Sequence, residues 1–519
     1  MSQIYDAFDI EYRIEYFGLP VHSHWKKNIR RWTYYSDSYN GGNDFRAGMY
    51  LTKYVMESDD EYHNRIKNVA LDNHCKSVVE TYNSFLFRQP PKREYGALAS
   101  DPNIDNFYKD ADLDGRSFDA FMRDVSTYSS VYGHCWVAVD KPKVIVSTRA
   151  EELQQGIRPY LSLYTPENVL DWKYMRRPSG VYELVEITIL DGIDETGAYF
   201  RTITPESTRI YQKLTDKDSK ESAELVDEIP NSIGRVPFVC VYAGRSTTKG
   251  IGISDISDLA DMQRAIYNEL SELEQLIRIS NHPSLVKTTT TRASAGAGAI
   301  IDLPDDIDPN LKPFLLEPNG SGISQILESI EKKIDSINRM ANMGGTRSTV
   351  STQMSGIALE TEFQLLNARL SQKADNLELA EEKIWDLYAA YQGIDTTDLL
   401  IDYPDSFNIH DKANTIQMLK TAKEVAPQNP ELLKEIDNML ASALVKDEDR
   451  LAEIKEHQQD SSEMEMEQRP NQIEHDPVDS AEDLVEHMME MIKSGMSKDQ
   501  IIQAHPELTQ LFNNNEGQA

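Results

Sequence analysis

Three aspartates at alternate positions form the stretch of the chain that most resembles a site for chemistry. Asp110, Asp112 and Asp114 precede Gly115, as in a calcium loop, where alternate carboxylates wrap a hard cation and glycine makes the turn. The twelfth position of such a loop carries a bidentate glutamate, and here it is Phe121. Two interpretations stay open, a cation loop and an acidic loop that leads into a helix, and the missing glutamate favours the second.

Two histidine–cysteine pairs could supply soft metal ligands, namely His74-Cys75 and His134-Cys135. A structural zinc site needs four ligands at short, paired spacings. Only Cys240 remains as a third thiol, and no Cys-x-x-Cys occurs. We therefore predict no metal site and no cofactor, and the odd number of distant cysteines indicates a reducing compartment rather than a disulfide framework.

The segment from Gly244 to Gly250 resembles a phosphate-binding loop only in composition. Such a loop ends in Gly-Lys-Ser/Thr and enters a helix, whereas here Lys249 precedes the second glycine. No Gly-x-Ser-x-Gly or His-Glu-x-x-His occurs, and 86 acidic residues make chance carboxylate pairs inevitable. We predict that the chain is not an enzyme, with an unrecognised catalytic site as the third interpretation of its function.

The elements around these motifs predict an α+β fold. Apolar spacing predicts helices over 61–89 and 116–131, the first ending at two prolines and the second running into a strand at 135–139. A β-rich part follows between residues 157 and 245. Its predicted strands are 160–164, 181–190, 198–203, 209–213 and 236–242.

Long amphipathic helices dominate the second half of the chain. Apolar residues at spacings of three and four predict helices over 253–281, 322–342 and 357–391. The first two are separated by a proline-rich irregular or β segment, 284–318. A Gly-, Ser- and Thr-rich loop, 343–356, separates the second from the third.

Charge is distributed unevenly. The chain has 53 Lys and Arg against 86 Asp and Glu, a formal net charge of −33, which argues against ordinary tight DNA binding. Residues 446–519 hold 19 acidic and 6 basic residues, and such blocks are usually solvated. The basic aromatic stretch 25–35 predicts either a nucleic-acid surface or an arm packed on a partner. No apolar run is long enough for a membrane helix, and the N-terminus does not resemble a signal peptide.

The order of these elements resembles the portal proteins of tailed bacteriophages, in particular the SPP1-like type. Four stretches carry the resemblance, which extends over roughly residues 60–420: 65–91, an early helix that ends before proline; 118–140, a helix, Tyr-Gly and strand; 238–276, a strand, turn and helix; and 354–388, a Ser-Gly-x-Ala-Leu start of a long helix.

The resemblance implies a ring-forming portal fold with a mixed wing domain, long stem helices, a small α/β clip and a helical crown. The implied segments are 1–60, N-terminal arm; 61–252, wing; 253–281, first stem helix; 282–318, clip; 319–342, second stem helix; 343–356, tunnel loop; 357–404, long wing helix and connection; and 405–519, crown and acidic C-terminal region.

The resemblance also implies a function. A homo-oligomeric ring, usually of twelve subunits, would occupy one capsid vertex of the virion after assembly in the host cytoplasm. Double-stranded DNA would pass through it during packaging and ejection without sequence specificity. The terminase large subunit, a head–tail adaptor, and the major capsid and scaffold proteins would be its partners, and no membrane would be involved. The alternative is a neck or tail adaptor, or another virion scaffold protein, that does not contact DNA.

Basic residues near the second stem helix are candidates to meet DNA phosphates. Lys332, Lys333, Arg339 and Arg347 are the predicted channel residues, and Lys287 and Arg292 are their counterparts in the clip. Helix-surface ion pairs, such as Glu328 with Lys332, are the alternative. The predicted tunnel-loop residues are Gly344, Gly345, Thr346, Ser348, Thr349, Val350 and Ser351.

Overall fold

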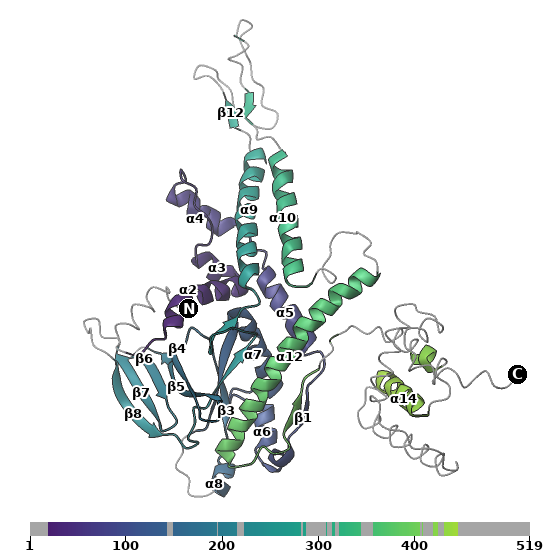
Figure 1. The fold of residues 1–519 in the computed structure, drawn as a ribbon. Helices are drawn as coiled ribbons and strands as arrows, with labels where there is room; N and C mark the ends of the chain where they lie inside the picture. The colour runs from purple at the N-terminus through teal and green to yellow at the C-terminus, as the bar shows by residue number, and fades with distance from the viewer. Residues whose placement is uncertain are drawn as a thin grey trace, which may run out of the picture. The chain divides into compact units, whose positions relative to one another are not determined.

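The chain divides into two compact units, Met1–Phe407 and Asn408–Ala519, and each is described by itself. The first unit combines helices with antiparallel sheets, which confirms the predicted mixture of helix and sheet (Figure 1). The computed structural model describes residues 19–142, 149–194, 196–214, 223–281, 284–286, 308, 314–316, 321–343, 356–404, 407, 419–423 and 430–444.

The predicted N-terminal arm contains a helix that packs into the main core. α2, Ser23–Asn40, buries Trp25 and Trp32, and the Trp25 indole N–H donates to the carbonyl of Glu167 at 3.2 Å. These rings lie inside their own chain, so they are not available to stack on bases, and contact of this stretch with a partner stays a prediction. Residues 1–18 lie outside the described part of the chain.

The single helix predicted over 61–89 is also wrong. Two helices occupy this stretch, α4 at Asp59–Asn68 and α5 at His74–Leu86. The Asn73 side chain accepts a hydrogen bond from the backbone N–H of Lys76 at 2.9 Å, which starts α5 as a new helix. The spacing of apolar residues continues across the gap between α4 and α5, so the sequence pattern did not reveal that the helix is interrupted.

A helix and a buried strand form the centre of the first unit. α7, Phe118–Tyr132, ends at Gly133, whose φ of 92° is favourable only for glycine. β2, His134–Asp140, follows directly and is the middle strand of the antiparallel sheet β3–β2–β9, with β3 at Tyr160–Tyr164 and β9 at Phe238–Tyr242. The predicted helix, Tyr-Gly and strand unit is confirmed.

A five-stranded antiparallel sheet extends the β-rich part, with its strands in chain order (Figure 1). The sequence did not predict its first and last strands, because β4 mixes polar and apolar residues and β8 is rich in acids and largely exposed. The strands are β4 at Val169–Arg176, β5 at Tyr182–Ile193, β6 at Gly197–Ile203, β7 at Ser207–Leu214 and β8 at Glu224–Pro230.

The three long helices predicted for the second half are confirmed. They are α9 at Ser257–Asn281, α10 at Ser321–Met340 and α12 at Gly356–Gln392. α9 and α10 lie side by side, and α12 packs along β9 and β2 (Figure 1). Within the predicted clip, β12 at Ser284–Val286 pairs antiparallel with β13 at Phe314–Leu316.

Short elements complete the described part of the first unit: α3 at Gly42–Ala47, β1 at Lys92–Glu94, η1 at Gly96–Ser100, α6 at Ile104–Lys109, α8 at Arg149–Gln154, β10 at Gly244–Arg245, β11 at Gly252–Ile253 and β14 at Leu400–Asp402. In the second unit, α14 spans Pro430–Leu444, and the acidic block 446–519 lies outside the described residues. Among the residues that the structure describes, no helix is both long and apolar enough to span a membrane.

Candidate functional site: the α9–α10 helix pair and its base

An apolar seam holds α9 against α10. Ile266 and Leu273 on α9 and Ile330 and Ile337 on α10 are buried, and each pair is seven residues apart, so each lies on one helix face. Burial of these side chains is what makes the two helices a stable pair. We call α9 and α10 together the helix pair.

A polar contact crosses the same seam. A carboxylate oxygen of Glu269 on α9 accepts hydrogen bonds from Lys333 Nζ at 2.5 Å and from Ser329 Oγ at 2.9 Å, both on α10. Of the predicted channel residues, Lys333 therefore lies between the two helices and contacts its own chain.

The exposed face of α10 carries a separate charged stripe. Glu328, Lys332, Asp335 and Arg339 follow one another at spacings of four, three and four. Lys332 Nζ lies 2.6 Å from Glu328 Oε1, and hydrogen bonding to Lys332 lowers the pKa of Glu328. The predicted i,i+4 ion pair is thus present, yet Lys332 remains 72% exposed. Arg339 is exposed and donates to Ser336 Oγ at 2.9 Å.

The other predicted site residues lie outside the described part of the chain. They are Arg347, the tunnel-loop residues Gly344, Gly345, Thr346, Ser348, Thr349, Val350 and Ser351, and the clip residues Lys287 and Arg292.

The chain leading into the predicted loop is anchored by buried side chains. Ala341 and Met343, which follow α10, are buried in the main core. The Tyr82 hydroxyl on α5 donates to the carbonyl of Ala341 at 2.7 Å, and the N–H of Met343 bonds to the carbonyl of Asn338 at 2.8 Å. These buried contacts therefore fix the backbone as far as residue 343, where the predicted loop begins.

A buried ion cluster anchors the start of α9. The Asp255 carboxylate accepts from Lys373 Nζ at 2.6 Å and from the Arg369 guanidinium at 3.1 Å, both on α12. Lys373 also donates to Ser130 Oγ on α7 at 2.8 Å. Burial alone would raise the pKa of Asp255, but Lys373 and Arg369 hold it below its usual range. We call these four residues the base of the helix pair.

Sequence reasoning missed the base. Asp255 stands just before a helix, where an aspartate is an ordinary capping residue. Its two cations come from α12, more than a hundred residues later, and their one-turn spacing is common on any helix. The only usable signal was weak, namely a Lys and an Arg on the long helix without an acidic residue at i+4.

Two glycines let the chain approach itself closely beside the base. A Cβ on Gly252 would lie 1.9 Å from the carbonyl oxygen of Gly133, and one on Gly133 would lie 2.7 Å from the carbonyl carbon of Gly252. The N–H of Gly252 donates to Nδ1 of His134 at 3.3 Å. Burial lowers the pKa of His134 to about 3, so the ring stays neutral and can accept this bond.

The residues considered first for chemistry have structural contacts instead. The Asp112 carboxylate accepts the backbone N–H groups of Asp114 and Arg116, and Asp110 pairs with Arg158 at 2.9 Å. These contacts support the acidic-loop interpretation, since guanidinium and amide groups occupy the carboxylates. Within the described ranges, no group of three or more His, Cys, Asp and Glu side chains is placed to hold a metal ion.

Three comparisons with known proteins bear on the identity of the chain. A family model described as phage portal protein, SPP1 Gp6-like, matches residues 20–464. A comparison with curated protein sequences finds no match.

Among solved structures, the chain is similar to components of gene transfer agent particles. One is in the neck of a native particle computed with C12 symmetry, with 9% identity, 70% of this chain and 89% of that chain covered, and a TM-score of 0.40. Another is in the neck of an empty particle computed with C6 symmetry, with 10% identity, 76% and 98% covered, and a TM-score of 0.43. A third is in the virion of the native particle, with 10% identity, 78% and 98% covered, and a TM-score of 0.41. Because the family model matches most of the chain, this protein belongs to the SPP1 Gp6-like family of phage portal proteins.

Proposed function

We propose that copies of this chain form a closed ring at one capsid vertex, through which double-stranded DNA enters during packaging and leaves during ejection. The ring docks the terminase large subunit and a head–tail adaptor, and it contacts the major capsid and scaffold proteins during assembly in the host cytoplasm. Its role is structural, without catalysis. The family match over residues 20–464 is the observation that carries this proposal.

The charge of the chain suits a conduit. At a net charge of −33 per copy, a ring repels phosphate at short range, and salt screens this repulsion beyond roughly 8–10 Å. DNA can therefore pass without being held. Sequence-independent contacts to phosphate need only a few cations, because phosphate contacts carry no base readout.

We assign the helix pair to the channel wall, with the charged stripe of α10 towards the DNA. The stripe alternates acids with bases, and Lys332 and Arg339 are exposed on it. A mixed stripe can meet phosphates briefly without building a continuous basic surface. Lys333 contributes differently, since its bond to Glu269 helps to keep the two helices together.

The base supports this assignment mechanically. A helix pair that guides DNA has to keep its direction while the cargo moves. Asp255 joins the start of α9 to α12 and, through Lys373, to α7, and both Asp255 and Lys373 are buried. The helix pair is therefore held by a cluster of charges, and separating these charges would cost several kcal/mol of free energy, about 3–5 kcal/mol where one partner is lost.

Native mass spectrometry and electron microscopy of the purified full-length chain test the ring. We expect a closed ring with a central hole that is wide enough for duplex DNA. A chain that stays monomeric when mixed with its scaffold and coat proteins would contradict the proposal.

Charge reversal tests the channel wall. A Lys332→Glu and Arg339→Glu double variant should form rings normally but package or retain less DNA per particle, because the exposed cations of the stripe are lost. The matched control is Lys109→Glu, which reverses an exposed charge on α6. Normal DNA content in the double variant would remove the stripe from the channel.

A further inference from the structure

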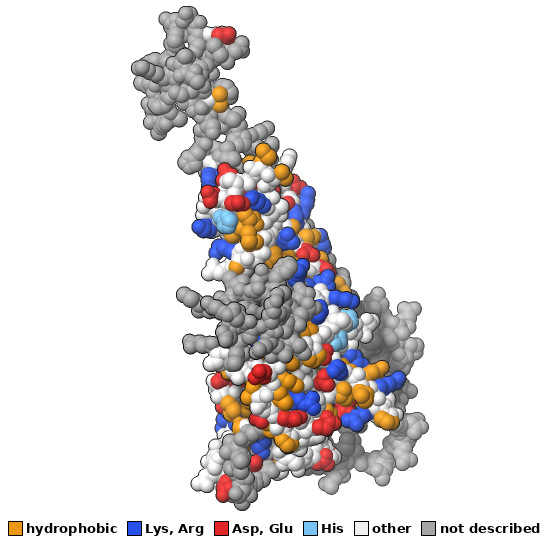
Figure 2. Space-filling view, turned by 90° about the vertical axis from the view of Figure 1, so that its left-hand side faces the viewer, with side chains coloured by type: hydrophobic (Ala, Val, Ile, Leu, Met, Phe, Trp, Pro, Cys, Tyr) orange, Lys and Arg blue, Asp and Glu red, His pale blue; other side chains and the backbone are white. Residues whose placement is uncertain are grey.

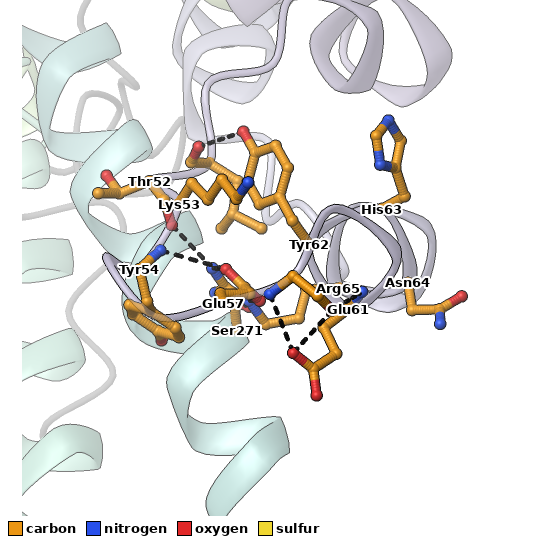
Figure 3. A network of polar contacts seen from close by, with 12 residues as sticks. Thr52, Lys53, Tyr54, Glu57, Glu61, Tyr62, His63, Asn64, Arg65 and Ser271 are labelled. Carbon is orange, nitrogen blue, oxygen red and sulfur yellow. Dashed lines mark hydrogen bonds and ion pairs between the residues drawn. The ribbon is translucent and has the colours of Figure 1, made fainter.

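Many cations of the first unit lie beside a carboxylate. Arg65 on α4 is an example, since its guanidinium bonds to the Glu57 carboxylate at 2.5 and 2.8 Å and to Ser271 Oγ at 3.0 Å (Figure 3). On the face that Figure 2 draws, Lys and Arg side chains likewise lie among Asp and Glu side chains. In a chain with 86 acidic and 53 basic residues, a group of cations without acidic partners therefore needs an explanation.

One such group lies at the surface of the first unit. All four of its members are exposed, and none of them forms an ion pair with a carboxylate among the residues that the structure describes. Arg176 donates to the carbonyl of Gly180 at 3.1 Å, and Arg245 donates to the side-chain oxygen of Asn376 at 3.3 Å, so these partners are neutral. We call the group the cation cluster, and its members are Arg176, Arg245, Lys249 and Lys383.

Two members of the cation cluster share one aromatic ring. Lys249 Nζ lies 4.6 Å from the centroid of the Tyr182 ring, and the guanidinium carbon of Arg176 lies 5.6 Å from the same centroid. The Tyr182 side chain is 48% exposed. An aromatic ring attracts a cation through its quadrupole but does not neutralise its charge. The ring therefore helps to place the two cations while their charge stays available to an anion.

The long helix α12 brings the other two members together. Asn376, which binds Arg245, and Lys383 are seven residues apart on α12, so they lie on the same helix face. The pKa of Lys383 is lowered, first by partial burial and next by the charge of Arg245, and the charge of Lys249 adds to this. Glu382 acts in the opposite direction, but more weakly. Like charges thus meet here without enough anionic groups to balance them.

The turn that carries Lys249 is the segment that resembles a phosphate-binding loop in composition. It joins β10 to β11 and enters no helix. Gly250 has a φ of 80°, and a Cβ at this position would lie 2.3 Å from Nε1 of Trp172. The Trp172 indole N–H donates to the carbonyl of Lys249 at 3.1 Å, and the N–H of Gly250 donates to the Tyr242 hydroxyl at 2.9 Å. The backbone of the turn is therefore fixed from the inside, and the Lys249 side chain is left exposed.

Exposed cations that repel one another favour an anion with several charges. Bringing like charges together is unfavourable unless an opposite charge offsets them. The members of the cluster lie on three elements, namely the β4–β5 hairpin, the β10–β11 turn and α12. Duplex DNA suits such a spread, because it carries one phosphate charge about every 1.7 Å along its axis. Hydroxyl groups also contact phosphates, and those of Thr247 and Tyr182 belong to exposed residues of the same two turns.

We propose that the cation cluster binds the phosphate backbone of duplex DNA, without base readout, at a surface separate from the charged stripe of α10. The inference rests on the proposed function, which brings duplex DNA to the ring, and it adds a second set of residues that contact this DNA. Met175 and Val181 are also exposed on the β4–β5 hairpin, by 60% and 63%. Methionine and arginine are enriched in protein interfaces, so an acidic protein partner is the alternative that the experiment has to exclude.

Binding of a small closed circular duplex tests the cation cluster. A closed circle cannot thread through a ring, so a channel contributes nothing to this measurement. The full-length chain should bind the circle, and the logarithm of the affinity should fall linearly with the logarithm of the salt concentration. In an Arg245→Gln, Lys249→Gln and Lys383→Gln variant, the slope should be smaller by about 2–3. The affinity of this variant at about 50 mM salt should be at least tenfold weaker.

The matched control removes the same charge from other elements. Lys67→Gln, Lys92→Gln and Lys109→Gln replace exposed lysines on α4, β1 and α6. The slope of this control should stay within about one of that of the unaltered chain, because its lysines lie outside the cluster. An equal loss in both triple variants would overturn the inference, since it would report the net charge alone.

The melting temperature shows whether the cluster variant is folded. It should be unchanged, because the three side chains are exposed. If it falls, Lys249→Gln alone carries the test, since the amine of Lys249 has no hydrogen-bond partner among the described residues. The slope should then be smaller by about one, and an unchanged slope would remove Lys249 from the DNA contact.

Electron microscopy and assembly of the same samples separate the proposals. Rings of the unaltered chain that do not bind the circle would overturn the DNA contact and leave the proposed function in place. Absence of rings from the unaltered chain would overturn the proposed function itself. Unchanged DNA binding by the cluster variant, together with its failure to assemble with coat and scaffold proteins, would replace the DNA contact with an acidic protein partner.

Discussion

The base and the charged stripe of α10 both consist of oppositely charged side chains, but they differ in their exposure to water. Asp255 and Lys373 at the base are 8% and 4% exposed, whereas Glu328 and Lys332 on the stripe are 64% and 72% exposed. Removing one partner of a buried pair leaves an uncompensated charge in a dry environment. Exposed pairs are worth little, because water and salt replace the partner.

This difference in exposure gives the base and the stripe different roles. The base determines where α9 begins relative to α7 and α12, and it resists change because each charge there depends on the others. The side chains of the stripe are exposed, and in the channel that we propose they exchange a neighbour for a passing phosphate. A stable anchor and an adaptable surface thus use the same residue types at different depths.

Asp255→Asn should give the largest effect. It leaves the buried Lys373 and the partly buried Arg369 without their anion, which we expect to destabilise the fold by about 3–5 kcal/mol. Chemical denaturation of the full chain, followed by circular dichroism, measures this change. Adding Lys373→Met should recover part of the loss, since the unpaired ammonium is then gone. If Asp255→Asn proves as stable as the unaltered chain, the base is not an anchor.

Acidification should weaken the region beside the base through His134. In the folded chain the pKa of His134 is about 3, below its ordinary value of 6.5. Below pH 6.5 the unfolded chain therefore binds a proton at this ring that the folded chain does not bind. This group therefore lowers stability as the pH falls from 6.5 towards 3, by up to about 1.4 kcal/mol per pH unit.

His134→Asn keeps a side-chain acceptor near Gly252 but cannot be protonated. The free energy of unfolding should therefore fall less between pH 6.5 and pH 5 in the variant than in the unaltered chain. Denaturation curves recorded at each pH measure this. Parallel pH dependences would show that His134 is not held neutral in the fold.

Glu328→Gln should give the smallest effect. Its pair with Lys332 is exposed, so we expect no measurable change in the free energy of unfolding. Thermal denaturation at low and high salt checks this, and the two salt conditions should agree. A clear loss of stability would end the contrast between the stripe and the base.

Local patterns predicted much of the fold because some elements are determined by residues close together in sequence. α9, α10 and α12 were found from apolar spacing, and the α7–Gly133–β2 unit from a helix followed by Tyr-Gly and a buried strand. The break between α4 and α5 was missed, since the cap at Asn73 interrupts the backbone while the apolar pattern continues.

The candidate site was predicted only in part, because local patterns reveal the exposed residues of one helix but not its contacts with other elements. Exposed cations on α10 follow from helical spacing, so Lys332 and Arg339 were identified correctly as exposed side chains. Lys333 is the next residue along, yet it turns inward to Glu269. Spacing on one helix does not reveal which flank its partner covers.

The sequence by itself determined the composition of this protein, its acidity, its long amphipathic helices and the order of elements that places it among phage portal proteins. The tertiary structure decided which charges are buried, that the rings of α2 belong to the core, and which cations have a carboxylate partner. These properties depend on contacts between residues far apart in the chain. Asp255 contacts Lys373, and Arg65 contacts Ser271, only after the helices that carry them have packed together.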